Sequence, residues 1–171
     1  MAESPQKTVL VVDDEEDVRK FLSMALKEAG FNVVAAHDGF EALDQVKKQK
    51  PDLISLDLVM PKRSGVKFYR DLIKNKEWVK IPIIIVTGHA RDDLGKADLK
   101  ELTMSGPGIY LEKPIKPSNY VAAIKHILGM DTSVEEKEAA KKVELQSELK
   151  NLVDEVDTET LIKIKEMMRK K

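Results

Sequence analysis

The sequence predicts an α/β protein with a doubly wound sheet of five parallel strands. From Thr8 to about Leu128, short apolar runs alternate with segments of helical period, which is the pattern of repeated βα units. The runs Val-Leu-Val-Val at 9–12 and Ile-Ile-Ile-Val at 83–86 are continuously apolar. Strands of this kind are typical of a parallel sheet that helices cover on both faces.

Each strand and helix is predicted from its own local signals. The expected strands are 8–12, 32–36, 53–57, 82–86 and 108–111. The expected helices are 15–29, 39–48, 65–75, 91–104 and 117–128. The first helix places Leu22 and Leu26 on one face, and Gly30 supplies its stop. The last helix begins at Pro117 and ends before Gly129.

The composition changes after Met130, where a charged segment begins. Between Asp131 and Lys171 there is no Pro, Gly or aromatic residue. Apolar residues recur there at helical spacing: Leu145, Leu149, Leu152 and Val156, then Leu161, Ile164 and Met168. Asp157 and Thr158 between the two sets predict a cap for a second helix. We expect an N-terminal tail at 1–7, an α/β domain at 8–129 and a helical extension at 130–171, as a hairpin or one interrupted helix.

Overall composition narrows the class of protein. The chain has 171 residues and no cysteine, which is compatible with a reducing compartment. We find no signal peptide and no apolar run of membrane-spanning length, so we expect a soluble cytoplasmic protein. The 29 Lys and Arg nearly balance the 30 Asp and Glu, so overall charge does not favour nucleic acid as a partner.

Chemically active side chains follow four of the predicted strands. They are Asp13 and Asp14 after the first, Asp57 at the third, Thr87 after the fourth and Lys113 after the fifth. The carboxyl ends of parallel strands share one edge of a sheet, where open α/β proteins bind ligands. We therefore expect one site built from these residues.

The residue types at this edge suit phosphoryl transfer. An aspartate can accept a phosphoryl group as an acyl phosphate, and neighbouring carboxylates supply the hard oxygen ligands of Mg²⁺. Lys113 can place its charge, and Thr87 its hydroxyl, against phosphoryl oxygens. Each residue alone also has an ordinary explanation, as a turn residue, a helix cap or a solvated lysine. The combination of all of them favours the site.

Several motifs resemble the receiver domain of bacterial two-component response regulators, including chemotaxis regulators. They span about residues 7–129 and read VLVVDDEEDVR, HDGFEAL, PDLISLDLVMPKRSG, IPIIIVTGHA and YLEKPIKP. The resemblance implies a flavodoxin-like strand order of 2-1-3-4-5 and a receiver domain at 8–129. It also implies that Asp57 accepts a phosphoryl group from a sensor histidine kinase or a phosphotransfer protein.

The resemblance implies roles for the residues around Asp57. Mg²⁺, or Mn²⁺ in its place, would be bound by Asp14, Asp57 and the backbone carbonyl of Val59, with Asp13 acting through water. Lys113 and Thr87 would assist phosphoryl transfer, and Thr87 would act with Tyr110 as the signalling switch. For Tyr110, a half-buried strand aromatic remains the alternative.

Three further residues carry structural predictions. The resemblance implies a cis Lys113–Pro114 bond, which only X-Pro sequences adopt at low cost; a rigid trans turn is the alternative. Gly65 would begin the helix that follows Asp57, and Gly88 would leave room beside the phosphoryl group.

The predicted function is that of a phosphorylation-dependent response regulator that signals through protein contacts. It would catalyse only its own phosphorylation and dephosphorylation. From Asp131 onward the net charge is −2 and there is no His, so we favour self-association or docking to a partner helix; a partly disordered tail is the alternative. Two other functions remain open: DNA binding through the C-terminal helices, and a metal-dependent phosphohydrolase, whose usual second acid would replace Val59.

Overall fold

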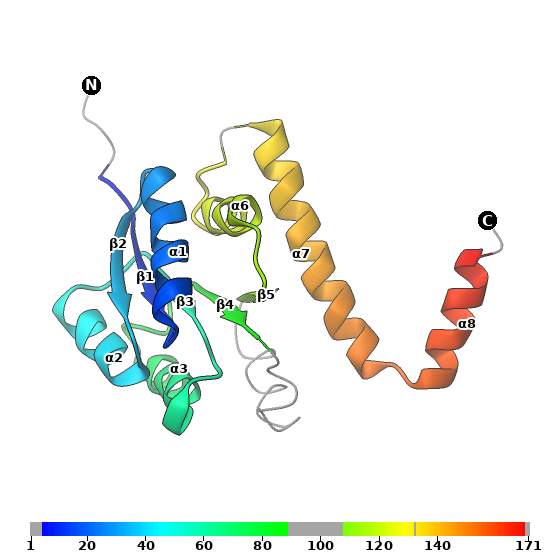
Figure 1. Cartoon of the computed structure of the whole chain (residues 1–171), viewed down its shortest axis with the longest axis horizontal. Coiled ribbons are helices and arrows are strands. Elements are labelled where there is room, and N and C mark those ends of the chain that lie inside the picture. Colours follow the sequence, from blue (N-terminus) through cyan, green and yellow to red (C-terminus); the bar gives the residue numbers. More distant parts are fainter. Residues whose placement is uncertain (1–4, 89–107, 132, 170–171) are drawn as a thin grey trace.

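Five parallel strands form a single sheet in the order β2-β1-β3-β4-β5 (Figure 1). The structure is a computed structural model that describes residues 5–88, 108–131 and 133–169. The strands are β1 (Thr8–Val12), β2 (Asn32–Ala36), β3 (Leu53–Leu56), β4 (Ile83–Thr87) and β5 (Gly108–Glu112). The predicted fold class and strand order are confirmed, and each predicted strand agrees with the observed one to within one residue.

Helices cover both faces of the sheet (Figure 1). One face is covered by α1 (Glu16–Glu28) and α6 (Pro117–Ile127), and the other by α2 (Gly39–Lys48) and α3 (Ser64–Lys74), which follows the 3₁₀ turn η1 (Pro61–Arg63). Successive side chains of β1 alternate between the two layers. Leu10 packs in the core with Phe68 of α3, and Val11 packs in the core with Leu22 of α1 and Ile124 of α6. The predicted helix at 91–104 lies outside the described residues.

The register of the strands brings their carboxyl ends together. Val12 is paired with Leu56 on one side and with Ala36 on the other. On the far side of β3, Thr87 is paired with Glu112. The residues that directly follow β1, β3 and β5 therefore lie along one edge of the sheet, as predicted.

The C-terminal extension forms two helices, α7 (Val134–Glu155) and α8 (Thr158–Arg169). The helix α7 packs on α6 and β5 (Figure 1). Its residues Ala140, Val143 and Ser147 are buried, and Val143 belongs to the same core cluster as Ile124 of α6. Two ion pairs flank this contact: Lys125 with Glu136 at 2.7 Å, and Lys150 with Glu112 of β5.

The helix α8 stands away from the rest of the molecule (Figure 1). The chain turns at Val156, whose backbone is extended. The carboxylate of Asp157 then accepts a hydrogen bond from the backbone N–H of Thr160 at 2.9 Å, which caps the new helix. None of the α8 side chains that the structure describes is buried. Among the described helices, none is both long enough and apolar enough to cross a membrane.

Candidate functional site

Three aspartates meet at the carboxyl edge of the sheet. Carboxylate oxygens of Asp13, Asp14 and Asp57 all lie within 4.8 Å of one another. Asp13 and Asp57 are only 1% and 3% exposed, whereas Asp14 is exposed. Two buried acids beside a third are costly, since unit charges about 4 Å apart repel by about 4 kcal/mol at an effective dielectric of about 20. Such a cluster needs a nearby positive charge.

The backbone fixes the two buried aspartates. The N–H of Asp13 donates to the carbonyl of Ala36 at 3.2 Å, and that of Asp57 donates to the carbonyl of Val12 at 2.9 Å. Their carboxylates also accept backbone hydrogen bonds, Asp13 from Glu15 at 2.9 Å and Asp57 from Val59 at 3.0 Å. Both carboxylates are therefore held in place by the chain itself.

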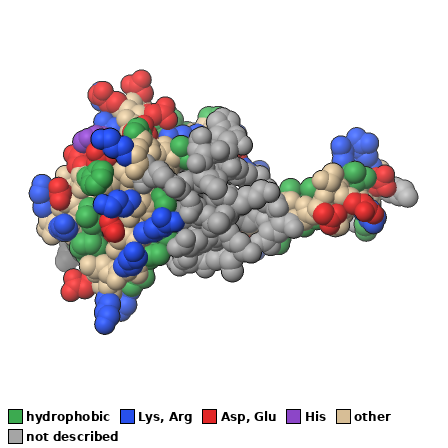
Figure 2. Space-filling model, turned by 90° about the horizontal axis from the view of Figure 1, so that it is seen from below, with side chains coloured by type: hydrophobic (Ala, Val, Ile, Leu, Met, Phe, Trp, Pro, Cys, Tyr) green, Lys and Arg blue, Asp and Glu red, His purple; other side chains and the backbone are tan. Residues whose placement is uncertain are grey.

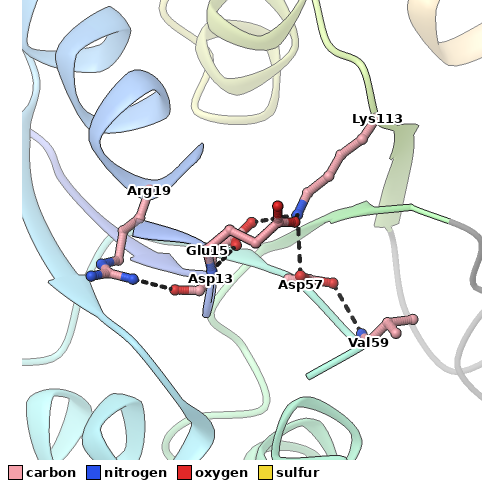
Figure 3. A network of polar contacts seen from close by, with 6 residues as sticks. All are labelled: Asp13, Glu15, Arg19, Asp57, Val59 and Lys113. Carbon is pink, nitrogen blue, oxygen red and sulfur yellow. Dashed lines mark hydrogen bonds and ion pairs between the residues drawn. The ribbon is translucent and has the colours of Figure 1, made fainter. Parts of the chain in front are cut away.

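Lys113 supplies the positive charge (Figure 3). Its Nζ lies 2.8 Å from Asp13 Oδ2, 3.2 Å from Asp57 Oδ2 and 3.1 Å from Glu15 Oε1. Burial on its own lowers the pKa of Lys113, but the hydrogen bond to Asp13 and the charge of Asp57 outweigh it and raise the pKa above its usual range. The amine therefore stays charged at neutral pH. The Lys113–Pro114 peptide bond, which follows it, is cis.

The charged form of Asp13 is destabilised even though Lys113 lies beside it. Burial raises the pKa of Asp13 above its ordinary value, and the hydrogen bonds from Lys113 and the Glu15 N–H only partly oppose it. The charged form is thus destabilised by its surroundings. Additional positive charge beside Asp13 would stabilise this charged form.

A close backbone approach lies directly under Asp57. A Cβ atom on Gly65 would sit 2.3 Å from the carbonyl oxygen of Asp57 and 2.9 Å from the Cα of Leu58. Only glycine lets the first turn of α3 pack this closely against the backbone that carries the acid. At Gly88, by contrast, a Cβ would meet no described atom within 4 Å.

Comparison with known proteins identifies the family. The sequence model of the response regulator receiver domain matches residues 9–125. This chain belongs to the response regulator receiver domain family. The solved structure of the Vibrio cholerae chemotaxis protein CheY4 has a TM-score of 0.62 and 27% identity to this receiver, and the match covers 71% of this chain and 98% of that one.

Two curated relatives show how much of the chain is shared. The phosphate regulon transcriptional regulatory protein PhoB of Pseudomonas aeruginosa is 36% identical over 122 residues, which cover 71% of this chain and 52% of PhoB. The polar-differentiation response regulator DivK of Brucella anthropi is 32% identical over 123 residues, which cover 72% of this chain and 97% of DivK. The receiver chain thus spans about half the length of PhoB and almost all of DivK.

Some predicted site residues of the receiver lie partly outside what the structure describes. The backbones of Thr87 and Tyr110 belong to β4 and β5, but their side chains lie outside the described residues. For Val59, the described contact is its N–H to Asp57 rather than its carbonyl. The roles predicted for these three residues therefore stay predictions.

Two residues of the receiver site were missed by sequence reasoning. Glu15 contacts Lys113, and Arg19 donates from Nη1 to the backbone carbonyl of Asp13 at 2.8 Å (Figure 3). Glu15 lies in an acidic run at the start of α1, where a helix cap is the usual expectation, yet its side chain makes no cap hydrogen bond. The spacing of the run gave no signal that separates a cap from a site residue.

The acidic cluster fits a divalent cation. Its donors are carboxylate oxygens, which are the ligands that Mg²⁺ and Mn²⁺ prefer. Burial raises the pKa of Asp13, so a cation beside it would stabilise its charged form. The receiver therefore presents a donor set of suitable chemistry.

Proposed function

We propose that this chain is a phosphorylation-dependent response regulator in which Asp57 accepts a phosphoryl group from a sensor histidine kinase or a phosphotransfer protein. The observation that carries the proposal is the position of Asp57 in the sheet. Its strand, β3, lies between β1, which carries Asp13 and Asp14, and β4 and β5, which lead to Thr87 and Lys113. A phosphoryl group on Asp57 would therefore lie between the residues at the end of β1 and those at the ends of β4 and β5.

Lys113 contacts both Asp13 and Asp57 and is placed to assist transfer to Asp57. Its Nζ already lies 3.2 Å from Asp57 Oδ2, and it stays charged because its acidic partners raise its pKa. A charged amine at this position can hold an oxygen of the incoming group. In the transfer, the P–N bond of a phosphohistidine whose other ring nitrogen carries a proton breaks as a P–O bond to a carboxylate oxygen of Asp57 forms, and the P–N electron pair stays on the ring, which leaves as neutral imidazole. Positioning and charge neutralisation supply the catalysis.

The cation is assigned to the same residues. We propose that Asp14, Asp57 and the Val59 carbonyl hold Mg²⁺ or Mn²⁺, with Asp13 acting through water. The cation supplies charge neutralisation for the phosphoryl oxygens. The chain itself keeps Asp13 and Asp57 fixed through backbone hydrogen bonds.

Signalling would follow from the added charge. A phosphoryl group brings roughly 1.5 to 2 negative charges and three acceptor oxygens to the edge of the sheet. We propose that the Thr87 hydroxyl turns toward it and that Tyr110 changes position with Thr87. The effect on the molecule is a shift between two populated states.

The extension at 131–171 is proposed to bind protein, through self-association or a partner helix. Its exposed apolar side chains support this. The receiver family match favours the regulator over the phosphohydrolase, and the acidic α7 argues against a DNA-binding extension, because a groove-binding helix is normally basic.

The proposal is tested by incubating the protein with a small-molecule phosphodonor and Mg²⁺ and measuring its intact mass. We expect the wild type to gain one phosphoryl group and Asp57→Asn to gain none. The same incubation with a chelator in place of Mg²⁺ should suppress the gain. A wild type that never gains the mass, or an Asp57→Asn variant that gains it equally, would contradict the proposal.

A further inference from the structure

The helix α7 has two faces, and the described part of the receiver covers one of them. Ala140 and Val143 are buried against the receiver, and Val143 is 4% exposed. With 3.6 residues per turn, Leu145, Leu149 and Leu152 lie on the opposite side of the helix. All three are exposed, Leu149 by 62%. We call these three leucines the leucine face of α7.

The helix α8 also presents apolar side chains that nothing covers in the described structure. Ile164 and Met168 lie one turn apart on one side of α8, with Met167 beside them, and Met168 is 75% exposed. The helix has only 12 residues, and helices of that length are marginal in water without a packing partner. Figure 2 shows the extension projecting from the body of the molecule, with hydrophobic side chains among charged ones. Exposed apolar side chains that share one side of a helix offer a surface for a packing partner.

The two helices have complementary charge. Residues 134–155 contain seven acidic and four basic residues, a net charge of −3. Residues 158–169 contain two acidic and three basic residues, a net charge of +1. Two helices of opposite net charge attract each other and disfavour pairing with a copy of themselves.

The charges also match at the edges of the two apolar faces. Glu144 and Glu148 directly precede Leu145 and Leu149, so they line one edge of the leucine face. Lys165 and Arg169 directly follow Ile164 and Met168 on α8. Both pairs are four residues apart, which is one helical turn. Lys163, on another side of α8, is already paired with Glu159 at 2.9 Å.

The two apolar faces are similar in length. The leucine face runs from position 145 to 152, and the apolar side of α8 runs from 161 to 168. Each covers about 10 Å at a rise of about 1.5 Å per residue. The two surfaces are thus similar in length and in the spacing of their charged residues, and their charges are opposite.

We propose that α8 of one copy packs on the leucine face of α7 of a second copy, and that the second copy returns the same contact. Within one chain, α8 stands away from its own α7 (Figure 1), so both surfaces are open to the second copy. A reciprocal exchange uses each surface once per chain and closes as a two-fold dimer. This inference rests on the proposed role of the extension as a protein-binding element and names its partner; it does not require phosphoryl transfer at Asp57.

Sedimentation of charge-reversed variants of the full chain tests the exchange. One variant is Lys165→Glu with Arg169→Glu, which makes both helices acidic at the contact. The other is Glu144→Lys with Glu148→Lys, which makes both basic. We expect the wild type to dimerise and each variant alone to have a dissociation constant at least tenfold higher. An equimolar mixture of the two variants should regain the dimer, because both contacts then join an acidic helix to a basic one.

The matched control is Lys76→Glu with Lys80→Glu. It changes the same number of charges at the same spacing, on exposed residues of the receiver outside the extension, and should dimerise like the wild type. Regained dimer in the mixture also shows that the variants are folded. A wild type that stays monomeric at all concentrations, or a mixture that stays monomeric, would overturn the inference. If such a monomer still gains a phosphoryl group, the proposed function stands, whereas a dimer that never gains one would overturn only the proposed function.

Discussion

The carboxyl edge of the sheet and the C-terminal extension both depart from the usual distribution of buried and exposed residues, and they do so in opposite ways. At the sheet edge, Asp13 and Asp57 are charged groups that are almost fully buried. In the extension, Leu149 and Met168 are large apolar side chains that are mostly exposed. Proteins usually bury apolar residues and expose charged ones, so departures in either direction are informative. The proposed cation and phosphoryl group would compensate the first departure, and the proposed protein contact would compensate the second.

The two regions also differ in how they are held. The buried aspartates are fixed by strand ends, backbone hydrogen bonds and Lys113, so their geometry is set before any ligand arrives. Among the described residues, the extension packs on the receiver along one side of α7. The loop that carries Pro114 and Ile115 lines a hollow of about 580 Å³ together with Val143 and Ser147 of α7. The buried carboxylates are thus preorganised by the chain itself, whereas the leucine face of α7 is exposed.

The largest loss in the free energy of unfolding is expected at the carboxyl edge of the sheet. Gly65→Ala places a methyl group 2.3 Å from the Asp57 carbonyl, so α3 or the backbone under the acid must move. We expect a loss of about 3 kcal/mol in the free energy of unfolding, at the upper end of overpacking effects. Urea denaturation of the purified protein measures it.

Gly88→Ala is the matched control at the same edge of the sheet. No described atom lies within 4 Å of the added methyl group, so we expect a much smaller change in the same measurement. Equal losses in the two variants would show that the close approach of Gly65 to the Asp57 backbone does not limit which residue fits there.

A smaller effect should separate the two faces of α7. Val143→Ala removes two buried carbon atoms from the receiver core, which should lower the free energy of unfolding by about 1 to 2 kcal/mol. Leu149→Ala changes an exposed residue and should alter it by less than about 0.5 kcal/mol in a monomer. Both are best measured in the Lys165→Glu, Arg169→Glu background, where the proposed dimer is weakened. A larger cost at Leu149 than at Val143 would reverse the assignment of the two faces.

At the acidic cluster we expect a modest gain in stability. Because burial raises the pKa of Asp13, its charged form destabilises the folded state, and Asp13→Asn should stabilise the protein by about 1 kcal/mol near neutral pH without Mg²⁺. The Asp13 carboxyl binds its proton more tightly in the folded wild type than in the unfolded chain. The free energy of unfolding of the wild type therefore falls as pH rises from about 3.8 through the folded-state pKa of Asp13. The advantage of the variant should therefore shrink as the pH is lowered. Urea midpoints across acidic and neutral pH measure this, and an advantage that grew toward low pH would contradict the assigned burial cost.

The strands and the site were predictable because they rest on strong local signals. Continuous apolar runs identify parallel strands, and the residues at the strand ends meet because parallel strands share an edge. The docking of α7 was not predictable in the same way. Its buried face consists of Ala140, Val143 and Ser147, which are small or polar, while the more hydrophobic leucines of the same helix face outward. Hydrophobic periodicity indicates the strongest apolar face of a helix, and in α7 that is not the face that packs on the receiver.

The site contacts of Glu15 and Arg19 were missed for a different reason. Charged residues at the start of a helix usually cap it or face solvent, and their spacing alone does not show which long side chain turns toward a neighbouring strand. Only the position of Lys113 directly after β5, far along the chain, gives Glu15 its role.

Of the three clustered aspartates, Asp57 is the one proposed to receive the phosphoryl group. Borohydride reduces an acyl phosphate to an alcohol, so it converts a phosphorylated aspartate into homoserine and marks its position in a peptide map. After incubation with a phosphodonor and Mg²⁺ and reduction, we expect homoserine at position 57 and intact aspartate at positions 13 and 14. Homoserine at position 13 or 14, or at none of the three, would contradict the assignment of Asp57 as the acceptor.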